Sequence, residues 1–451
     1  MANTKLTRTF GSGGSRVKWA WSGWVKRAAL GVEQVIFCAY ENSTNQTQCK
    51  FTSGDLLYFN DESSGNTNGR IVSNAKYLDT NAWYHLVFVW DKNNSTNTDR
   101  IKMYVNGERV TSFSDTGNWP SDTSQMNNDS LGREHEIGVK NGSNDYFDGC
   151  MSHIHFCDGY AYQASDFGSV DSVTGEWQIN TAPSVSYGTT GYWILKDGNT
   201  VTDSSPNSNT WTVGGGALTK TLDNPSNNFA TIMKSLGSDV IGSTVTFKYG
   251  NLDVNDPSGS ASGINPNFIS TLGMPSKGKW YCEVRPDSFS TSSGHSIGIF
   301  RTKGSTDDTG EGELELNTPK IRYIFADTSI YIIKYGTNDQ TGLTSITSNQ
   351  TVGMALDLDN GTLQYYVNGS ARHNQITGIN SANDGYDYFF HAGLESSSSG
   401  RYGRYYWNFG NGVFNNTVLT GTTYTDSNGQ GKFQYQPPTN FLALCTKNLN
   451  I

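Results

Sequence analysis

AWYHLVFVWD at residues 82–91 and DRIKMYVNG at residues 99–107 carry the clearest secondary-structure signals of this chain. Both stretches combine aromatic and β-branched residues, which fit the half-buried surface of a pleated sheet. The second stretch ends in Asn106-Gly107, a dipeptide that accepts two consecutive positive φ angles and closes a two-residue hairpin. The two stretches therefore predict β-strands and a tight hairpin turn.

The same pattern recurs along the chain: GTLQYYVNG at residues 361–369 repeats the hairpin signal in the second half. Short apolar runs alternate with Gly, Asn, Asp and Ser clusters, as in β-sandwiches. The composition agrees, with 50 Gly, 24 Tyr, 21 Phe and 11 Trp but only 16% charged residues. We expect an all-β fold with fewer than about one residue in ten in helices. The clearest strand-like runs are residues 17–26, 83–90, 101–105, 146–157, 191–195, 279–284, 296–300, 321–326, 330–335, 352–358 and 363–367.

The length of 451 residues predicts more than one domain, because single hydrophobic cores stop growing near roughly 250 to 300 residues. A first sandwich is expected over residues 1–200 and a second over residues 225–412. Residues 201–224, rich in Asp, Ser, Asn, Gly and Thr, are expected to be a linker. Residues 413–451 are expected to form a C-terminal extension that packs on the second domain.

The net charge and the cysteines exclude several classes of protein. A formal net charge of −9 argues against a nucleic-acid partner, because phosphate binding needs clustered Lys and Arg. Neither an apolar leader nor a run of about 18 apolar residues occurs, so no signal peptide and no membrane insertion are expected.

Free thiols are expected, because the cysteines form no CxxC motif and no zinc spacing. The six are Cys38, Cys49, Cys150, Cys157, Cys282 and Cys445.

Two families share motifs with this chain. The first half resembles LamG or pentraxin-like concanavalin A-type domains, and the second half resembles a SPRY domain. Both domains are two-sheet sandwiches, so the resemblance implies two tandem antiparallel jelly rolls. The LamG-like motifs are WSGWVKR at 21–27, AWYHLVFVWD at 82–91, YVNG at 104–107 and YFDGCMSHIHFCDG at 146–159. The SPRY-like motifs are GKWYCEV at 278–284, VGMALDLDNGTLQYYVNG at 352–369, HAGL at 391–394 and WNFGNG at 407–412.

The pairing of these domains, with LDNPSNNFATI at 222–232 and FQYQPPTNFLALCTKNL at 433–449, resembles virion appendage proteins of marine bacteriophages, such as tail or head fibres. The resemblance implies a non-enzymatic virion component made in the host cytoplasm. It further implies contacts with other virion proteins, a homo-oligomer, with a trimer favoured, and recognition of a bacterial surface glycan. The alternatives are a capsid decoration protein without a receptor role and a polysaccharide depolymerase related to glycoside hydrolases.

A glycoside hydrolase would need two carboxylates about 5 to 9.5 Å apart. Glu311, Glu313 and Glu315 alternate in GEGELELN, but their Asp- and Gly-rich flanks are typical of a solvated loop. Asp357 and Asp359 are better explained as a strand end and its turn. No catalytic residue is therefore predicted.

The metal content is left open by the sequence. His153 and His155 are two residues apart and are expected to share a strand face, with Asp148 or Glu136 as a conceivable third ligand. The alternative is a pair of histidines on the polar face of a strand. No cofactor is expected, although calcium stays an alternative because LamG-type domains often carry it. The acidic loop residues available to calcium are Asp91, Asp99 and Asp148.

Trp119 is the candidate glycan-binding residue. It lies in GNWPSDTS within the long polar loop at residues 112–133, and the strand pattern leaves it unplaced. An exposed tryptophan in a loop suggests a contact surface. The alternative is that Trp119 folds back over the open end of the sandwich.

Overall fold

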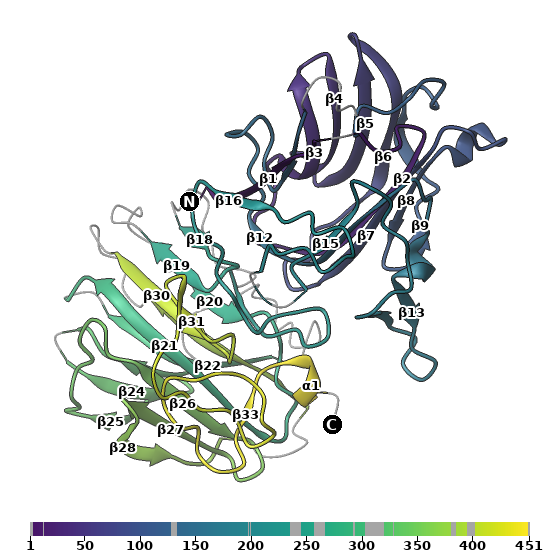
Figure 1. Ribbon diagram of the computed structural model, residues 1–451. Helices are drawn as coiled ribbons and strands as arrows, with labels where there is room; N and C mark the ends of the chain where they lie inside the picture. Colours follow the sequence, from purple (N-terminus) through teal and green to yellow (C-terminus); the bar gives the residue numbers. More distant parts are fainter. Residues whose placement is uncertain are drawn as a thin grey trace. The chain divides into compact units, whose positions relative to one another are not determined.

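Figure 1 shows the protein as a computed structural model. The structure describes residues 3–11, 13–127, 133–196, 198, 200–234, 245–256, 267–291, 294–302, 320–327, 329–379, 385–394 and 402–449. Strands make up 49% and helices 3% of it, which confirms the all-β prediction. Contacts divide the chain into two compact units, residues 1–220 with 224–226 and residues 221–223 with 227–451.

In the described part of the first unit, two antiparallel sheets face each other. The eight-stranded sheet has the order β10-β6-β5-β4-β3-β11-β1-β16, and the six-stranded sheet has the order β15-β12-β2-β7-β8-β9. The strands of the larger sheet are β1 Lys5–Thr9, β3 Gln34–Asn42, β4 Asn45–Phe51, β5 Leu56–Ser63, β6 Asn66–Lys76, β10 Phe113–Thr116, β11 Glu134–Ile137 and β16 Thr212–Gly214. Those of the smaller sheet are β2 Lys18–Arg27, β7 Tyr84–Asp91, β8 Ile101–Val105, β9 Glu108–Arg109, β12 Gly149–Asp158 and β15 Tyr192–Ile194.

Aromatic side chains fill the space between these two sheets. Trp19 and Trp21 alternate inward along β2 and are fully buried. Trp21 stacks on Phe37 with ring centroids 4.6 Å apart, and Trp19 lies parallel to Trp90. Rings of this size bury large apolar areas, so the strand pattern of the sequence translates directly into the core.

The outer face of the six-stranded sheet is covered by the chain that follows β12. Phe167 and Tyr187 pack there against Ala20 and Val87. The covering segment contains the 3-10 helix η3 Ala164–Asp166 and a hairpin of β13 Gly168–Val170 and β14 Trp177–Ile179. This face of the sheet is therefore a second, smaller apolar layer.

The prediction that residues 201–224 form a linker is wrong for residues 201–220, which belong to the first unit. β16 pairs with β1, and Trp211 is buried against the first core. The Asp203 carboxylate accepts hydrogen bonds from the backbone N–H groups of Ser205 and Asn209 at 2.8 and 2.6 Å. The polar run thus marks an Asp-centred turn inside the first unit, since Asp and Asn side chains stabilise turns as readily as they occur in linkers.

The second unit, over its described residues, is also a pair of antiparallel sheets (Figure 1). Their orders are β17-β20-β29-β22-β23-β24-β25 and β18-β19-β30-β21-β26-β27-β28. The first sheet contains β17 Ile232–Lys234, β20 Asn267–Ser270, β22 His295–Thr302, β23 Lys320–Ile324, β24 Tyr331–Lys334, β25 Thr337–Thr341 and β29 Asp387–Leu394. The second contains β18 Thr246–Lys248, β19 Asp253–Asp256, β21 Lys279–Phe289, β26 Val352–Asp357, β27 Thr362–Val367, β28 Ser370–Ile376 and β30 Gly403–Asn408.

The C-terminal residues form a strap over the second sheet of this unit. β33 Leu442–Ala443 pairs in parallel with β21, and Phe433 packs edge-on against Tyr281. The carboxylate of Glu283 accepts hydrogen bonds from the backbone N–H groups of Gln434 and Tyr435 at 2.9 and 2.8 Å. The other elements of the strap are β31 Val413–Phe414, β32 Thr417–Val418 and α1 Thr446–Leu449.

Other local predictions can be compared directly with the structure. Asn106-Gly107 and Asn368-Gly369 have positive φ at both residues, which confirms the two hairpin turns. None of the six cysteines forms a disulfide. Cys38 lies opposite Gln48 while Cys49 lies opposite Phe37, so the two thiols point to opposite faces. In the described part of the chain no helix is long and apolar enough to cross a membrane.

Candidate functional site

The outward side chains of β4 and β5 form a polar face on the eight-stranded sheet. Along each strand the alternate residues Thr47, Cys49 and Phe51, and Leu57, Phe59 and Asp61, point inward, so their neighbours point outward. We call the outward set the polar face. Its members are the three cross-strand pairs Gln46 with Glu62, Gln48 with Asn60, and Lys50 with Tyr58.

The outer two of these pairs interact. The Gln46 Nε2 donates a hydrogen bond to the Glu62 Oε2 at 2.7 Å. The Lys50 Nζ lies 5.0 Å from the centroid of the Tyr58 ring, which is a cation–π contact. Burial raises the pKa of the Tyr58 hydroxyl to about 12, so this hydroxyl is neutral and can both donate and accept.

The middle pair is buried and unsatisfied. Asn60 is 0% exposed, and neither its Oδ1 nor its Nδ2 has a hydrogen-bond partner. Gln48 is 4% exposed, and its Oε1 also lacks a partner. A buried polar group without a partner costs about 1 to 3 kcal/mol, and native proteins retain such groups rarely. Two such residues lie directly opposite each other here, so this pair has hydrogen-bonding groups that the described chain leaves unused.

The apolar clusters of the first unit do not include the polar face in the described part of the chain. These clusters lie between the sheets and on the outer side of the six-stranded sheet. Arg70 of β6, opposite Asn60, flanks the face and forms an ion pair with Asp115 at 2.9 Å. The polar face therefore combines a phenol and paired charges with three amide side chains that are buried.

Sequence reasoning missed this face although its signal was present. QTQCKF in β4 alternates polar and inward residues, as does LYFNDE in β5. Alternation of this kind predicts which side chains share a face. It does not predict that Gln48 and Asn60 are opposite each other, because the register depends on the hairpin between the strands.

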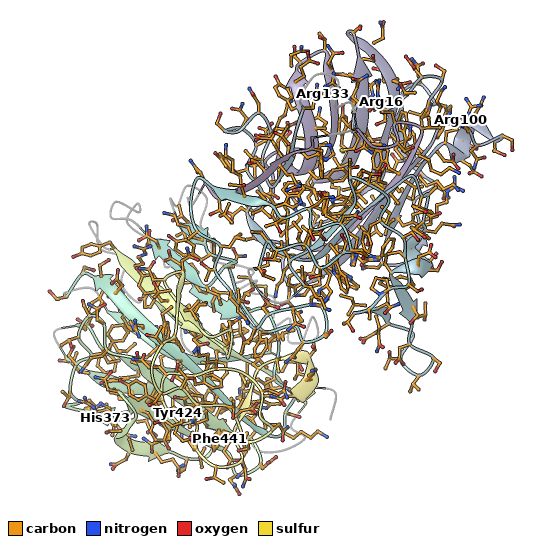
Figure 2. All side chains as sticks on the ribbon, viewed as in Figure 1. Arg16, Arg100, Arg133, His373, Tyr424 and Phe441 are labelled. Carbon is orange, nitrogen blue, oxygen red and sulfur yellow. The ribbon has the colours of Figure 1, made fainter. Side chains whose placement is uncertain are left out.

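Trp119 follows the alternative given for it, since it is half-buried and packs against the core of the first sandwich. Three arginines at one end of the unit hold the surrounding loop (Figure 2). Arg16 donates to the Ser124 carbonyl at 2.9 Å, Arg100 donates to the Pro120 carbonyl at 2.9 Å, and Arg133 donates to Gln125. Residues 120–125 of the loop are thus held to the end of the sandwich, and the glycan-binding role of Trp119 stays a prediction.

A β-bulge interrupts the strand alternation from which His153 and His155 were expected to share a face. His153 has a φ of 47°, and the register of β12 against β2 shifts between Ser152 and His155, which is a β-bulge. The ring of His155 is buried, 5.0 Å from that of Trp193, and its Nδ1 is 2.9 Å from the Tyr187 hydroxyl. The side chain of His155 is therefore occupied by packing.

The structure shows the partners of several acidic residues that were considered as metal ligands or catalytic carboxylates. Among the described residues no group of three His, Cys, Asp or Glu side chains could hold a metal ion. Asp91 and Asp99 form ion pairs with Lys18 and Arg109. Asp357 ends β26 and accepts a hydrogen bond from the Asn360 backbone N–H at 2.9 Å, which confirms its turn role. Glu311, Glu313 and Glu315 lie outside the described residues.

The buried pair Ser22 and His85 resembles a serine nucleophile beside its general base. The Ser22 Oγ lies 2.9 Å from the His85 Nε2, but the Trp177 Nε1 donates to the His85 Nδ1 at 3.0 Å. Because Nδ1 accepts, the neutral ring carries its proton on Nε2 and donates it to Ser22. Burial also lowers the pKa of His85 to about 3. His85 therefore cannot take a proton from Ser22 in this arrangement.

Comparisons with known proteins agree with this architecture. Residues 8–166 match the family model for the concanavalin A-like lectin/glucanases superfamily, so the polar face lies within the matched domain. The chain is thus an all-β protein of antiparallel jelly-roll sandwiches, the first of which is concanavalin A-like. No curated protein matches the chain.

Three solved structures are similar to parts of the chain in fold alone. The SPRY domain of human HERC1 is 15% identical, covers 36% of this chain and 91% of its own, and has a TM-score of 0.29. The PSpry domain of TRIM65 is 13% identical, covers 40% of this chain and 90% of its own, and has a TM-score of 0.28. A heptameric SAP-like pentraxin from Limulus polyphemus is 15% identical, covers 47% of this chain and 88% of its own, and has a TM-score of 0.29.

Proposed function

We propose that this chain is a non-enzymatic glycan-binding protein and that the polar face of the first sandwich is its binding surface. The observation that carries the proposal is the buried, unpartnered pair Gln48 and Asn60. Sugar hydroxyls donate to amide oxygens and accept from amide nitrogens, so a glycan would satisfy the atoms that the protein leaves unpaired. Because Asn60 is 0% exposed, neighbouring side chains must move for a hydroxyl to reach it.

Binding is favoured over hydrolysis on this face because its acids are already used. Glu62 accepts from Gln46, and Glu136 accepts from the backbone N–H groups of Asn141 and Gly142 at 2.8 and 2.6 Å. A glycosidase needs one free nucleophile or base and one free acid. A lectin needs neither, and the matched superfamily includes lectins as well as glucanases.

We expect Gln48→Leu to weaken glycan binding by about tenfold or more, or about 1.4 kcal/mol. The test measures binding of the purified chain to bacterial surface polysaccharides immobilised on a sensor. The matched control is Gln178→Leu, since Gln178 is exposed on the β13–β14 hairpin. Equal binding by all three proteins would place the site elsewhere, and release of reducing ends would favour the depolymerase.

We further propose that the chain is a multiple-copy component of a bacteriophage appendage, trimeric and in contact with other virion proteins. The support is the resemblance of its domain pairing and closing segment to such proteins. Several copies acting at once would give useful avidity to a weak sugar site.

In labelled intact virions we expect the chain at a fibre or spike, and the purified chain should block adsorption to the host. Blocking should fail with Gln48→Leu, which serves as the control for non-specific effects. A position in the capsid shell with no effect on adsorption would favour the decoration protein over a receptor-binding role.

A further inference from the structure

We infer that the polar face selects neutral, hydroxyl-rich glycans and rejects polyanionic ones. This inference rests on the proposed function, because it names the ligand class of the same face. It follows from which atoms are unpaired and from which charges are already paired.

The unpaired buried atoms of the face are mostly acceptors. Within the three pairs they are the side-chain oxygens of Gln46, Gln48 and Asn60 and the Nδ2 of Asn60. The bordering Arg70 adds an Nε that makes no hydrogen bond, although it lies 2.9 Å from the Asp115 carboxylate. A sugar hydroxyl carries a proton to donate to such an oxygen, whereas sulfate and carboxylate oxygens can only accept. A neutral ring with adjacent hydroxyls therefore fits this set of atoms, and an anionic substituent would face amide oxygens without a proton between them.

The cations that border the face are engaged by this chain. Arg70 is paired with Asp115, and Lys50 is paired with Glu33 at 2.7 Å. Lys140 lies 5.7 Å from the centroid of the Tyr40 ring. Strong recognition of anions needs a guanidinium or ammonium group that can turn its donors to the ligand, and an anion here would compete with two intramolecular carboxylates.

Negative charge beside the unpaired amides also disfavours an anionic ligand. Glu62 lies on the face next to Gln46, and Glu136 of β11 is reached from Gln48 through Cys38 of β3. Like charges repel at short range with little screening where water is excluded. The electrostatics and the hydrogen-bond inventory thus both favour an uncharged ligand.

The test is affinity electrophoresis of the full chain in gels that contain polysaccharides. The probes are a neutral glucan, a mannan and a galactan, each beside a derivative of the same polymer whose primary hydroxyls have been oxidised to carboxylates. We expect retardation by at least one neutral polymer and binding weaker by about tenfold or more to its oxidised form. Between about 50 and about 500 mM salt the affinity for the neutral polymer should stay within about twofold, because no ion pair is formed.

Gln48→Leu separates the two ways in which this test can fail. If the oxidised polymers bind as tightly as the neutral ones, or more tightly, and Gln48→Leu abolishes that binding, the neutral ligand class is wrong and the binding face stands. If no polymer retards the wild-type chain and bacterial surface polysaccharides do not bind it either, the proposed function itself is wrong. Gln178→Leu should behave as wild type throughout.

Discussion

Replacing Asn60 by leucine is expected to raise the free energy of unfolding of the first sandwich by about 1 to 2 kcal/mol and to abolish glycan binding. Asn60 is fully buried and both its polar atoms are unpaired, so its amide costs the fold about 1 to 3 kcal/mol. Leucine has a similar size and removes this cost together with the groups that would hold a sugar. A gain in stability with a loss of binding is typical of a residue kept for function.

Asn68 provides the matched control, because it is a buried asparagine of the same sheet with its hydrogen bonds made. Its Nδ2 donates to Asp61 and the Thr123 carbonyl at 2.9 and 3.1 Å, and its Oδ1 accepts from the Asp122 N–H at 3.1 Å. Asn68→Leu is therefore expected to lower stability by about 2 to 3 kcal/mol.

Urea titration of both variants measures this difference in stability through the midpoint at which the first sandwich unfolds. If Asn60→Leu were destabilised as much as Asn68→Leu, the amide of Asn60 would be satisfied in solution. The polar face would then lose the observation on which the binding proposal rests.

Replacing Glu283 by alanine is expected to destabilise the second sandwich by about 3 to 5 kcal/mol and to release the C-terminal strap. Glu283 is 0% exposed, and its carboxylate also accepts from the Asn408 Nδ2 at 3.1 Å. Its removal takes an acceptor from two part-buried backbone N–H groups and from the Asn408 Nδ2, which still donates to the Lys432 carbonyl at 3.0 Å. Each lost acceptor costs up to about 1 to 3 kcal/mol. The cost of burying the carboxylate itself offsets part of this loss, which keeps the net effect below the sum.

Limited proteolysis and urea titration check this prediction together. Residues 433–449 should be cut first in Glu283→Ala, ahead of any cleavage in the sheets. Asp339→Ala is the control, since Asp339 is on the surface and lies 3.8 Å from Lys334, and exposed ion pairs contribute about 0 to 1 kcal/mol. A loss below about 1 kcal/mol with a protected strap would show that the apolar contacts alone hold it.

The same variant should remove a pH dependence of stability. Burial raises the pKa of Glu283 from 4.5 to about 7. The folded state therefore holds a proton that the unfolded state has lost, and stability falls as the pH rises from 4.5 towards about 7. Glu283→Ala should lack this slope, which gives the proteolysis result an independent check.

Local chemistry explains why so much of the fold followed from the sequence. The Asn-Gly turns and the alternation of apolar residues in strands such as β7 act within a few residues. Tertiary packing overrides such signals where two outcomes have similar local energy. Polar residues 201–220 suit a turn as well as a linker, and Trp119 suits an exposed loop as well as a buried end.

The strand pattern, the two sandwiches and the hairpin turns of this protein were predictable from short stretches of sequence, because backbone propensity and side-chain alternation are properties of short segments. Which outward side chains meet depends instead on how the strands pack in the folded protein. Gln48 and Asn60 are opposite each other through the register of β4 against β5, and His153 leaves the alternation through a bulge. A shift of one residue in either strand would turn every side chain to the other face, so the candidate site depends on the packing that fixes the register.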